Sequence, residues 1–557
     1  SQPIVIGAYG TGVKPVITGF TNLTNWTSIG GGIYQSEITN CTPPLNIVKI
    51  NGKNTPIGRY PNSGVLNFET HSGLTSITDN QLSGTPNWTG AEVVIRKNRY
   101  TLARYPITNH TNATLTYPGT GEMPFDNFGY FIQNDIKTLD VFSEWYLNPS
   151  TNRLQVYFGT SVPASQSVKV STVDTLLNCF YQSYVTINNL DFEGANIFAL
   201  YVKGGQNVTV LSCGIDFVGK TGIYAGTTNF KIENCNINHC NQRALLSGSP
   251  NTIIRNNIIK NSGMIPGMSD LGGSYVGIDI VGGDSTLIEY NELDSIGAHG
   301  IFVRGNNSVV KNNLINNFSL VLDDIGGIYT VGSYSGRKII GNIVLNGLGN
   351  IDGTTSTSTS RSAKGIFMET NSTDVDVIDN TVAHCSFSGI HLNNSRDIRI
   401  RNNVSFNNKF QFLSQSYSTI PAEQTRNLTS FKNIFFSKSA SQVSLQLFSG
   451  INDVNLFFSS ADSNFYCRPI DDTYTIRTQV VNTSTRHSLA LWKTFSGKDP
   501  NSKKAPQSLT DENDILFAYN ASQNNKVIAL NAVYLDVYGT IYSGSYTLLP
   551  YKSVVLI

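Results

Sequence analysis

One internal repeat constrains the fold of this chain more than any other feature. It reads apolar-x-x-N-x-apolar, with Cys sometimes in place of Asn, and its central residue falls at Asn188, Cys213, Cys235, Asn257, Asn291, Asn313, Asn342, Asn380, Asn403 and Asn433. Successive positions are 22 to 38 residues apart, and a spacing of 22 is the most frequent. A period near 22 with insertions predicts a right-handed parallel β-helix, an all-β fold whose coils stack at about 4.8 Å. The repeated side chains would then form an internal ladder.

A second motif, G-I-x-apolar, recurs in phase with the first, for example as "GIYTV" at 327–331 and "GIFME" at 365–369. Because side chains alternate along a strand, each Ile points inward and its successor points outward. The expected external column is Tyr224, Asp279, Phe302, Tyr329, Phe367 and His391. Beside this column we expect Arg304 and Glu369, with His299 and Lys364 just before the glycines.

The long spacings come from extra residues at 264–275, 318–326 and 347–363. All three insertions fall directly before a G-I strand, so they lie at the same corner of the coil. Insertions at one corner of a solenoid usually build its binding face. The loops and the polar external column therefore predict one cleft.

The repeat does not extend over the whole chain. From about 44 to 165 the sequence is rich in aromatic residues and proline. Further along, "SLALWKTFSG" predicts a short helix that begins after a Ser488 cap and ends at Gly497. Alternating strands follow it to the end of the sequence. We predict first β-helix coils at 1–43, a β-rich inserted domain at 44–165, the main parallel β-helix with its cleft loops at 166–470, and a short helix with a C-terminal β-sandwich-like domain at 471–557, which also caps the last coil.

Composition narrows the class of protein. Charged residues make up 14% of the chain, below the roughly 25% typical of soluble domains. The net charge is +1, which gives little support to nucleic-acid binding, and no apolar run reaches the roughly 18 residues of a membrane span. The seven cysteines form no CxxC pair and are expected to be buried free thiols. We expect a secreted bacterial protein, extracellular or periplasmic, that acts as a monomer.

Three stretches, "NGKNTPIGRYPN", "LDVFSEWYLNPSTNRLQVYF" and "LVLDDIGGIYT", occur in that order around the ladder. Together with the ladder, these stretches resemble secreted bacterial right-handed β-helix carbohydrate-active enzymes, in the group that includes α-galactosidases, β-xylosidases and α-L-fucosidases. The resemblance covers most of residues 1–435. It implies a glycoside hydrolase that degrades an oligo- or polysaccharide with carboxylates on the helix face, requires no cofactor, and carries a β-rich insertion.

Glycoside hydrolysis needs two carboxyl groups, one that protonates the leaving oxygen and one that attacks or activates water. Asp323 and Asp324 lie at the expected cleft, and Glu369 points outward on the next coil. We predict these three as catalytic residues, with the pKa of one of the adjacent acids raised by its neighbour. Alternatively, the two aspartates form a turn that accepts backbone N–H bonds or binds a structural cation such as Ca²⁺.

Six further residues are predicted to bind substrate: Asp279, His299, Arg304, Tyr329, Lys364 and His391. The histidines could instead be bonded within the ladder, the two cations could be solvated, and the aromatic residues could stack between coils. A polysaccharide lyase is an alternative function, with Arg304, Lys364, His299 and Tyr329 available to neutralise a uronate and remove its proton. A non-catalytic glycan-binding solenoid is a second alternative.

Overall fold

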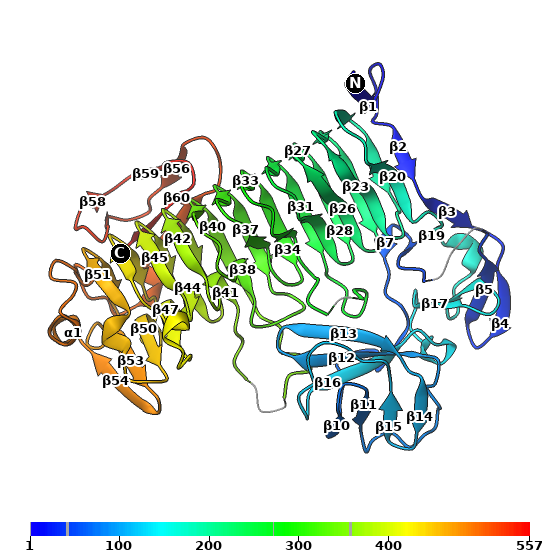
Figure 1. The fold of residues 1–557 in the computed structure, drawn as a ribbon, viewed down its shortest axis with the longest axis horizontal. Coiled ribbons are helices and arrows are strands. Elements are labelled where there is room, and N and C mark those ends of the chain that lie inside the picture. The colour runs from blue at the N-terminus through cyan, green and yellow to red at the C-terminus, as the bar shows by residue number, and fades with distance from the viewer. Residues whose placement is uncertain (1, 40–43, 271, 356–358) are drawn as a thin grey trace.

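The computed structural model describes residues 2–39, 44–270, 272–355 and 359–557. Its body is a right-handed parallel β-helix, as predicted, built from three long sheets of 12, 12 and 13 strands that run the length of the stack (Figure 1). The first sheet runs from β1 (Ile4–Gly7) through β21 (Val185–Asn188) to β51 (Phe458–Asp462), and the second from β2 (Val16–Thr18) through β22 (Asp191–Glu193) to β52 (Phe465–Cys467).

The third sheet contains the G-I strands. Its strands, in order, are β20 (Thr175–Phe180), β23 (Phe198–Gln206), β26 (Thr221–Thr228), β29 (Arg243–Ser247), β32 (Ile278–Val281), β35 (Ile301–Arg304), β38 (Gly326–Thr330), β41 (Lys364–Met368), β44 (Ser388–Asn393), β47 (Phe410–Ser416), β50 (Val443–Ser449), β53 (Ile476–Val480) and β54 (Thr483–His487). The isoleucines of the motif are fully buried, and a Cβ on Gly327 would lie 2.5 Å from Cγ1 of Val344. Close packing in the core therefore explains both residues of the motif.

Strand register confirms the external column. Asp279 pairs with Phe302, Phe302 with Tyr329, Tyr329 with Phe367, and Phe367 with His391. One rung was missed, because Leu246 of β29 pairs with both Tyr224 and Asp279. The coil of Leu246 reads "ALLS" and so lacks the G-I motif that marks the other rungs.

The predicted asparagine ladder runs through the core. From Asn257 to Asn433, each side-chain amide donates to the Oδ1 of the next asparagine at 2.9–3.0 Å. The ladder extends one rung further than predicted, to Asn464, which donates to the buried Asp499 at 3.0 Å. Asn188 is not a rung, because it pairs with Leu211 and so lies two residues before the position of Cys213.

The cysteines behave as packing residues. Cys213 and Cys235 occupy neighbouring rungs, where the Cys213 N–H donates to Sγ of Cys235 at 3.3 Å and the Cys235 N–H donates to Asn257 at 2.9 Å. Six cysteines are buried free thiols, as expected. Cys41 lies outside the described residues.

Along the sequence, antiparallel sheets come between the first coil and the main stack, although β1 and β2 pair directly with β21 and β22. β12 (Glu92–Asn98) and β13 (Thr101–Pro106) form a hairpin within a five-stranded sheet that lies beside the helix (Figure 1). The N–H of Leu102 donates to the carbonyl of Gly272 at 2.9 Å, which joins the hairpin to a cleft loop. The antiparallel region is wider than 44–165, because β3 (Phe20–Leu23) and β19 (Val168–Ser171) pair with each other.

The two parts of the C-terminal region cover different surfaces of the β-helix: α1 covers its end, and the strands cover one side. Helix α1 (Leu489–Ser496) has the two predicted caps, Ser488 and Gly497. Its Trp492 packs in the core of the β-helix and covers the last coil. The strands from β55 (Leu516–Asn520) to β60 (Lys552–Leu556) form three antiparallel pairs. They pack on outward residues of the second sheet such as Phe406 and Phe436. The expectation that these strands cap the last coil is therefore wrong.

Within the described residues, no helix has the length and apolar character needed to cross a membrane.

Candidate active site

A cavity of about 680 Å³ lies on the outer face of the third sheet, beneath the inserted hairpin. The sheet contributes one wall, the 273–276 loop and Ile325 contribute others, and Tyr100 and Thr101 enter from the turn between β12 and β13. Six of the nine predicted site residues line this cavity: Asp279, His299, Arg304, Asp324, Tyr329 and Glu369. The predicted cleft thus exists, and the insertion closes one side of it.

Two arginines of the hairpin hold the cleft loops in place. Arg96 is buried, which lowers its pKa to about 10, and it donates to the carbonyl oxygens of Val321 at 2.9 Å and Asn350 at 2.7 Å. The carbonyl of Arg99 accepts the N–H of Asp323 at 2.9 Å. The hairpin therefore joins two of the predicted cleft loops and brings Tyr100 over the site.

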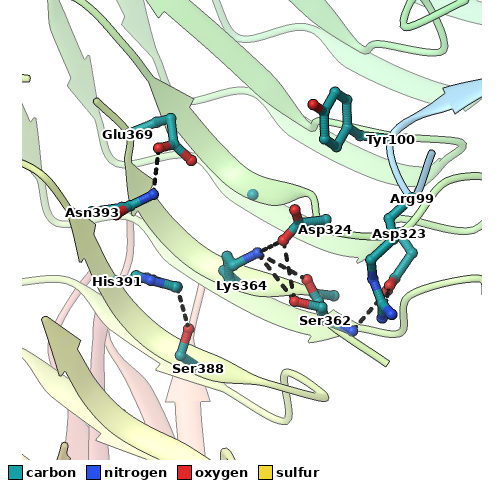
Figure 2. A network of polar contacts seen from close by, with 12 residues as sticks. Arg99, Tyr100, Asp323, Asp324, Ser362, Lys364, Glu369, Ser388, His391 and Asn393 are labelled. Carbon is teal, nitrogen blue, oxygen red and sulfur yellow. Dashed lines mark hydrogen bonds and ion pairs between the residues drawn. The ribbon is translucent and has the colours of Figure 1, made fainter. Parts of the chain in front are cut away.

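The two adjacent aspartates have different environments. Asp323 is fully buried, forms an ion pair with Arg99, and accepts the N–H of Ser362 at 2.7 Å (Figure 2). Asp324, which adopts a left-handed backbone conformation with φ of 64°, turns its carboxylate to the cavity. The structure thus corrects the prediction for Asp323, whose carboxylate fastens the loop from behind the cavity.

Lys364 determines the charge state of Asp324. Burial alone would raise the pKa of Asp324, but the ammonium group of Lys364 and a hydrogen bond from Ser362 lower it below its ordinary value. Lys364 itself is 2% exposed and lies under the Asp324 carboxylate rather than in the cavity. Two predictions are therefore corrected: Asp324 is an ionised carboxylate rather than an acid with a raised pKa, and Lys364 binds Asp324 instead of substrate.

Glu369 faces the same cavity from the end of β41. Its carboxylate accepts hydrogen bonds from the N–H of Thr370 at 3.0 Å, the hydroxyl of Thr370 at 2.9 Å and the side-chain amide of Asn393 at 2.6 Å (Figure 2). Among the described residues, Glu369 is the one carboxyl group of the cavity lining that has no ion-pair partner. Hydrogen bonds alone therefore fix the Glu369 carboxyl at the cavity wall.

Asp279 lies at the other end of the cavity, where it is 3% exposed. It accepts a hydrogen bond from Nε of Arg243 at 2.8 Å and one from Nη2 of Arg304 at 3.5 Å. The Arg304 guanidinium also lies over the ring of Phe302, 4.2 Å from its centre. Two cations therefore share one buried carboxylate.

Both predicted histidines are neutral at pH 7, with His391 buried and His299 half-buried. Burial lowers the pKa of His299 to about 4 and that of His391 to about 3. His299 lines the cavity and stacks on Tyr329 with ring centres 4.3 Å apart, while its Nδ1 lies 3.1 Å from the Gly326 carbonyl. His391 contacts Gln415 through Nε2 at 2.7 Å and lies outside the cavity lining, which corrects its prediction as a substrate contact.

Rings of the aromatic column stack between coils and also line the cavity. Phe302 and Tyr329 pack with ring centres 4.7 Å apart, and Tyr329 and Phe367 at 5.3 Å, so the rings stack between coils. The same three rings line the cavity. Tyr224 instead stacks on Tyr201 and lies outside this lining.

Three residues of the site were missed from the sequence: Tyr100, Arg243 and Asn393. Asn393 ends "GIHLN" two positions after His391, so strand alternation was a usable signal for it. Arg243 opens the strand that lacks the G-I motif, and Tyr100 lies in the insertion. Neither has a local pattern that predicts a place in the cavity.

The described residues hold no group of three or more His, Cys, Asp or Glu side chains with the geometry of a metal site.

A family model described as right handed beta helix region matches residues 176–344 and 273–456, which together span half of the chain. The chain belongs to this right-handed β-helix family. No curated protein matches the sequence. Among solved structures, this β-helix protein is similar to one named "Glycoside hydrolase", with a TM-score of 0.56 and 14% identity over 72% of this chain and 83% of the other.

Two further solved structures are similar at lower TM-scores. XylC in complex with xylose has a TM-score of 0.46 and 12% identity, over 98% of this chain and 89% of its own. The tailspike protein of E. coli bacteriophage HK620 in complex with a pentasaccharide has a TM-score of 0.38 and 10% identity, over 69% of this chain and 79% of its own. At such identities, these similarities describe the β-helix fold alone.

Proposed function

We propose that this protein is a secreted, monomeric glycoside hydrolase that cleaves an oligo- or polysaccharide in the cavity on the third sheet. One observation supports the proposal most directly. Asp324, kept ionised by Lys364, and Glu369, which has no cationic partner among the described residues, line the same cavity from neighbouring coils (Figure 2). Glycoside hydrolysis requires two carboxyl groups that flank the scissile bond, one as proton donor and one as nucleophile or base.

The roles follow from these environments. Glu369 protonates the departing glycosidic oxygen, and Asp324 either attacks the anomeric carbon or removes a proton from the attacking water. Lys364 keeps Asp324 ionised in a site that would otherwise favour its neutral form. Nothing in this scheme needs a cofactor, and a structural Ca²⁺ stays a separate expectation.

The rest of the cavity suits a sugar ligand. Phe302, Tyr329 and Phe367 present aromatic surface on which the apolar face of a sugar ring stacks. Tyr100 lies opposite them, and burial together with Glu122 raises its pKa to about 12, so its hydroxyl stays protonated. That hydroxyl donates to Oε1 of Glu122 at 3.3 Å, and its oxygen can accept a hydrogen bond from a sugar hydroxyl.

A glycan panel tests the proposal and separates it from the two alternatives. The purified protein is incubated with neutral and acidic oligo- and polysaccharides, and both reducing ends and absorbance of unsaturated uronides are followed. We expect new reducing ends without that absorbance. Unsaturated products would instead establish a lyase, and binding without any cleavage would establish a glycan-binding solenoid; either result overturns the proposal.

A further inference from the structure

One end of the cavity has more positive charge than its own contacts neutralise. Arg243 and Arg304 both contact the single carboxylate of Asp279, which is 3% exposed. Among the described residues, Asp279 is the hydrogen-bond acceptor of both guanidinium groups, through one N–H of each. A guanidinium has five N–H donors, so most of the donors at this end have no protein acceptor.

The other charges of the cavity do not compensate for this excess. Asp324 is already neutralised by Lys364. Glu369 lies on the same face of the sheet as Arg304, two coils further along, because Phe302 pairs with Tyr329 and Tyr329 with Phe367. Two coils correspond to about 10 Å along the helix axis. The excess positive charge is therefore local to the Arg243–Arg304 end, one coil from Asp324 and two coils from Glu369.

The arginines are held ready for a ligand. Arg304 is oriented by Asp279 on one side and by the ring of Phe302 on the other, while its side chain remains 29% exposed. Arg243 is fixed by its bond to Asp279 and is 14% exposed. A guanidinium whose orientation is already set loses little freedom when it binds a planar oxyanion with two parallel hydrogen bonds.

We propose that Arg243 and Arg304 form a subsite for an anionic sugar, one that bears a carboxylate or a sulfate ester. Its anionic group binds between the two guanidinium groups, and the sugar lies on Phe302. The scissile bond, near Asp324 and Glu369, then joins this sugar to its neighbour. This inference rests on the proposed function, because it names the substrate class of the same cavity.

The test measures binding, which does not depend on turnover. Dissociation constants are determined by ligand-observed NMR for D-glucuronate against D-glucose, D-galacturonate against D-galactose, and D-glucose 6-sulfate against D-glucose. We expect at least one charged sugar to bind about tenfold more tightly than its neutral parent, as a charge-assisted hydrogen bond predicts. The carboxylate and sulfate probes identify which anion is preferred.

Variants connect that preference to the two arginines. Arg304→Met and Arg243→Met, each checked for folding by circular dichroism, should abolish it. Arg401→Met, which replaces an exposed arginine of the first sheet, should leave it unchanged. Equal binding of charged and neutral sugars, or a preference that survives in a folded Arg304→Met protein, would overturn the subsite. Cleavage of a neutral glycan together with such a result would leave the proposed hydrolase intact.

Discussion

At the scale of single residues, the ion-pair partner decides what each carboxylate of this site can do. Asp323 and Asp324 are neighbours in the chain, yet one contacts Arg99 from the insertion and the other contacts Lys364 from the next coil. Asp279 contacts two arginines, and Glu369 is held by hydrogen bonds alone among the described residues. Similar side chains therefore have different chemistry in one cavity.

The Lys364→Met variant tests the charge state of Asp324. Without the ammonium group, burial is opposed much less, and the pKa of Asp324 rises. Because Asp324 acts as an anion, activity should then be lost at a higher pH on acidification. The measurement is the pH dependence of kcat/KM, with Lys338→Met, at an exposed position, as the control. If kcat/KM of Lys364→Met falls on acidification at the same pH as that of the wild type, this role for Lys364 is contradicted.

His391 should make the protein sensitive to acid. Burial and the nearby Lys364 lower its pKa from 6.5 to about 3, so the unfolded chain binds a proton in this range and the folded protein does not. The free energy of unfolding therefore falls as the pH drops from 6.5 towards 3, by up to about 1.4 kcal/mol per pH unit for this group.

The His391→Gln variant removes this contribution to the pH dependence of the free energy of unfolding. Urea unfolding at pH 7 and pH 4.5 should show a smaller loss of stability on acidification for His391→Gln than for the wild type. Identical losses would show that His391 is not the group responsible.

The residue scale is also where prediction from sequence was weakest. Strand alternation placed Asp279, Tyr329 and Glu369 on the outer face, because that property depends on local spacing. The sequence could not separate Asp323 from Asp324, since their partners lie far along the chain. Tyr100 was missed because its position depends on how the insertion docks, which no periodic pattern describes.

At the scale of elements, the asparagine ladder and the G-I strands fix the coil. Each ladder amide is buried and joins successive coils, and each motif glycine allows its strand to pack closely on the core. These features repeat with the coil, which is why the sequence predicted them and also predicted which side chains face outward. The rung at Leu246 was missed because its coil lacks the G-I motif.

Removing one rung should destabilise the helix measurably. In Asn342→Ala, the backbone N–H of Asn313 loses its acceptor, Oδ1 of Asn342 at 3.0 Å, and a buried donor without a partner costs about 1–3 kcal/mol. Asn236→Ala, at an exposed position of β28 (Asn236–Cys240), is the matched control. Urea unfolding followed by circular dichroism should show a lower midpoint for Asn342→Ala alone. Equal midpoints in the two variants would contradict the structural role of the ladder.

At the scale of the whole molecule, two additions complete the solenoid. The insertion closes one side of the cavity through Tyr100 and fastens its loops through Arg96 and Arg99. The C-terminal strands cover apolar residues on the outer face of the second sheet, where Phe517 stacks on Phe406 with ring centres 4.7 Å apart. The sequence predicted that both additions exist but not the surfaces that they cover, because neither contact follows the repeat.

A chain truncated after residue 508 tests the second of these contacts. Removal of the C-terminal strands exposes Phe406, Phe436 and their apolar neighbours as one patch. Large exposed apolar patches promote association, so we expect the truncated protein to self-associate in size-exclusion chromatography and to bind a hydrophobic dye. A truncated protein that elutes as a monomer and binds no dye would contradict this covering role.

The most direct test of the central claim is the initial rate of reducing-end release by Glu369→Gln on the best glycan of the panel. Glutamine keeps the hydrogen-bonding shape of the side chain but cannot donate the proton to the leaving oxygen. We predict a fall of at least about 100-fold relative to the wild type, while Glu292→Gln, on the second sheet outside the cavity, keeps the wild-type rate. A folded Glu369→Gln protein that releases reducing ends at the wild-type rate would contradict it.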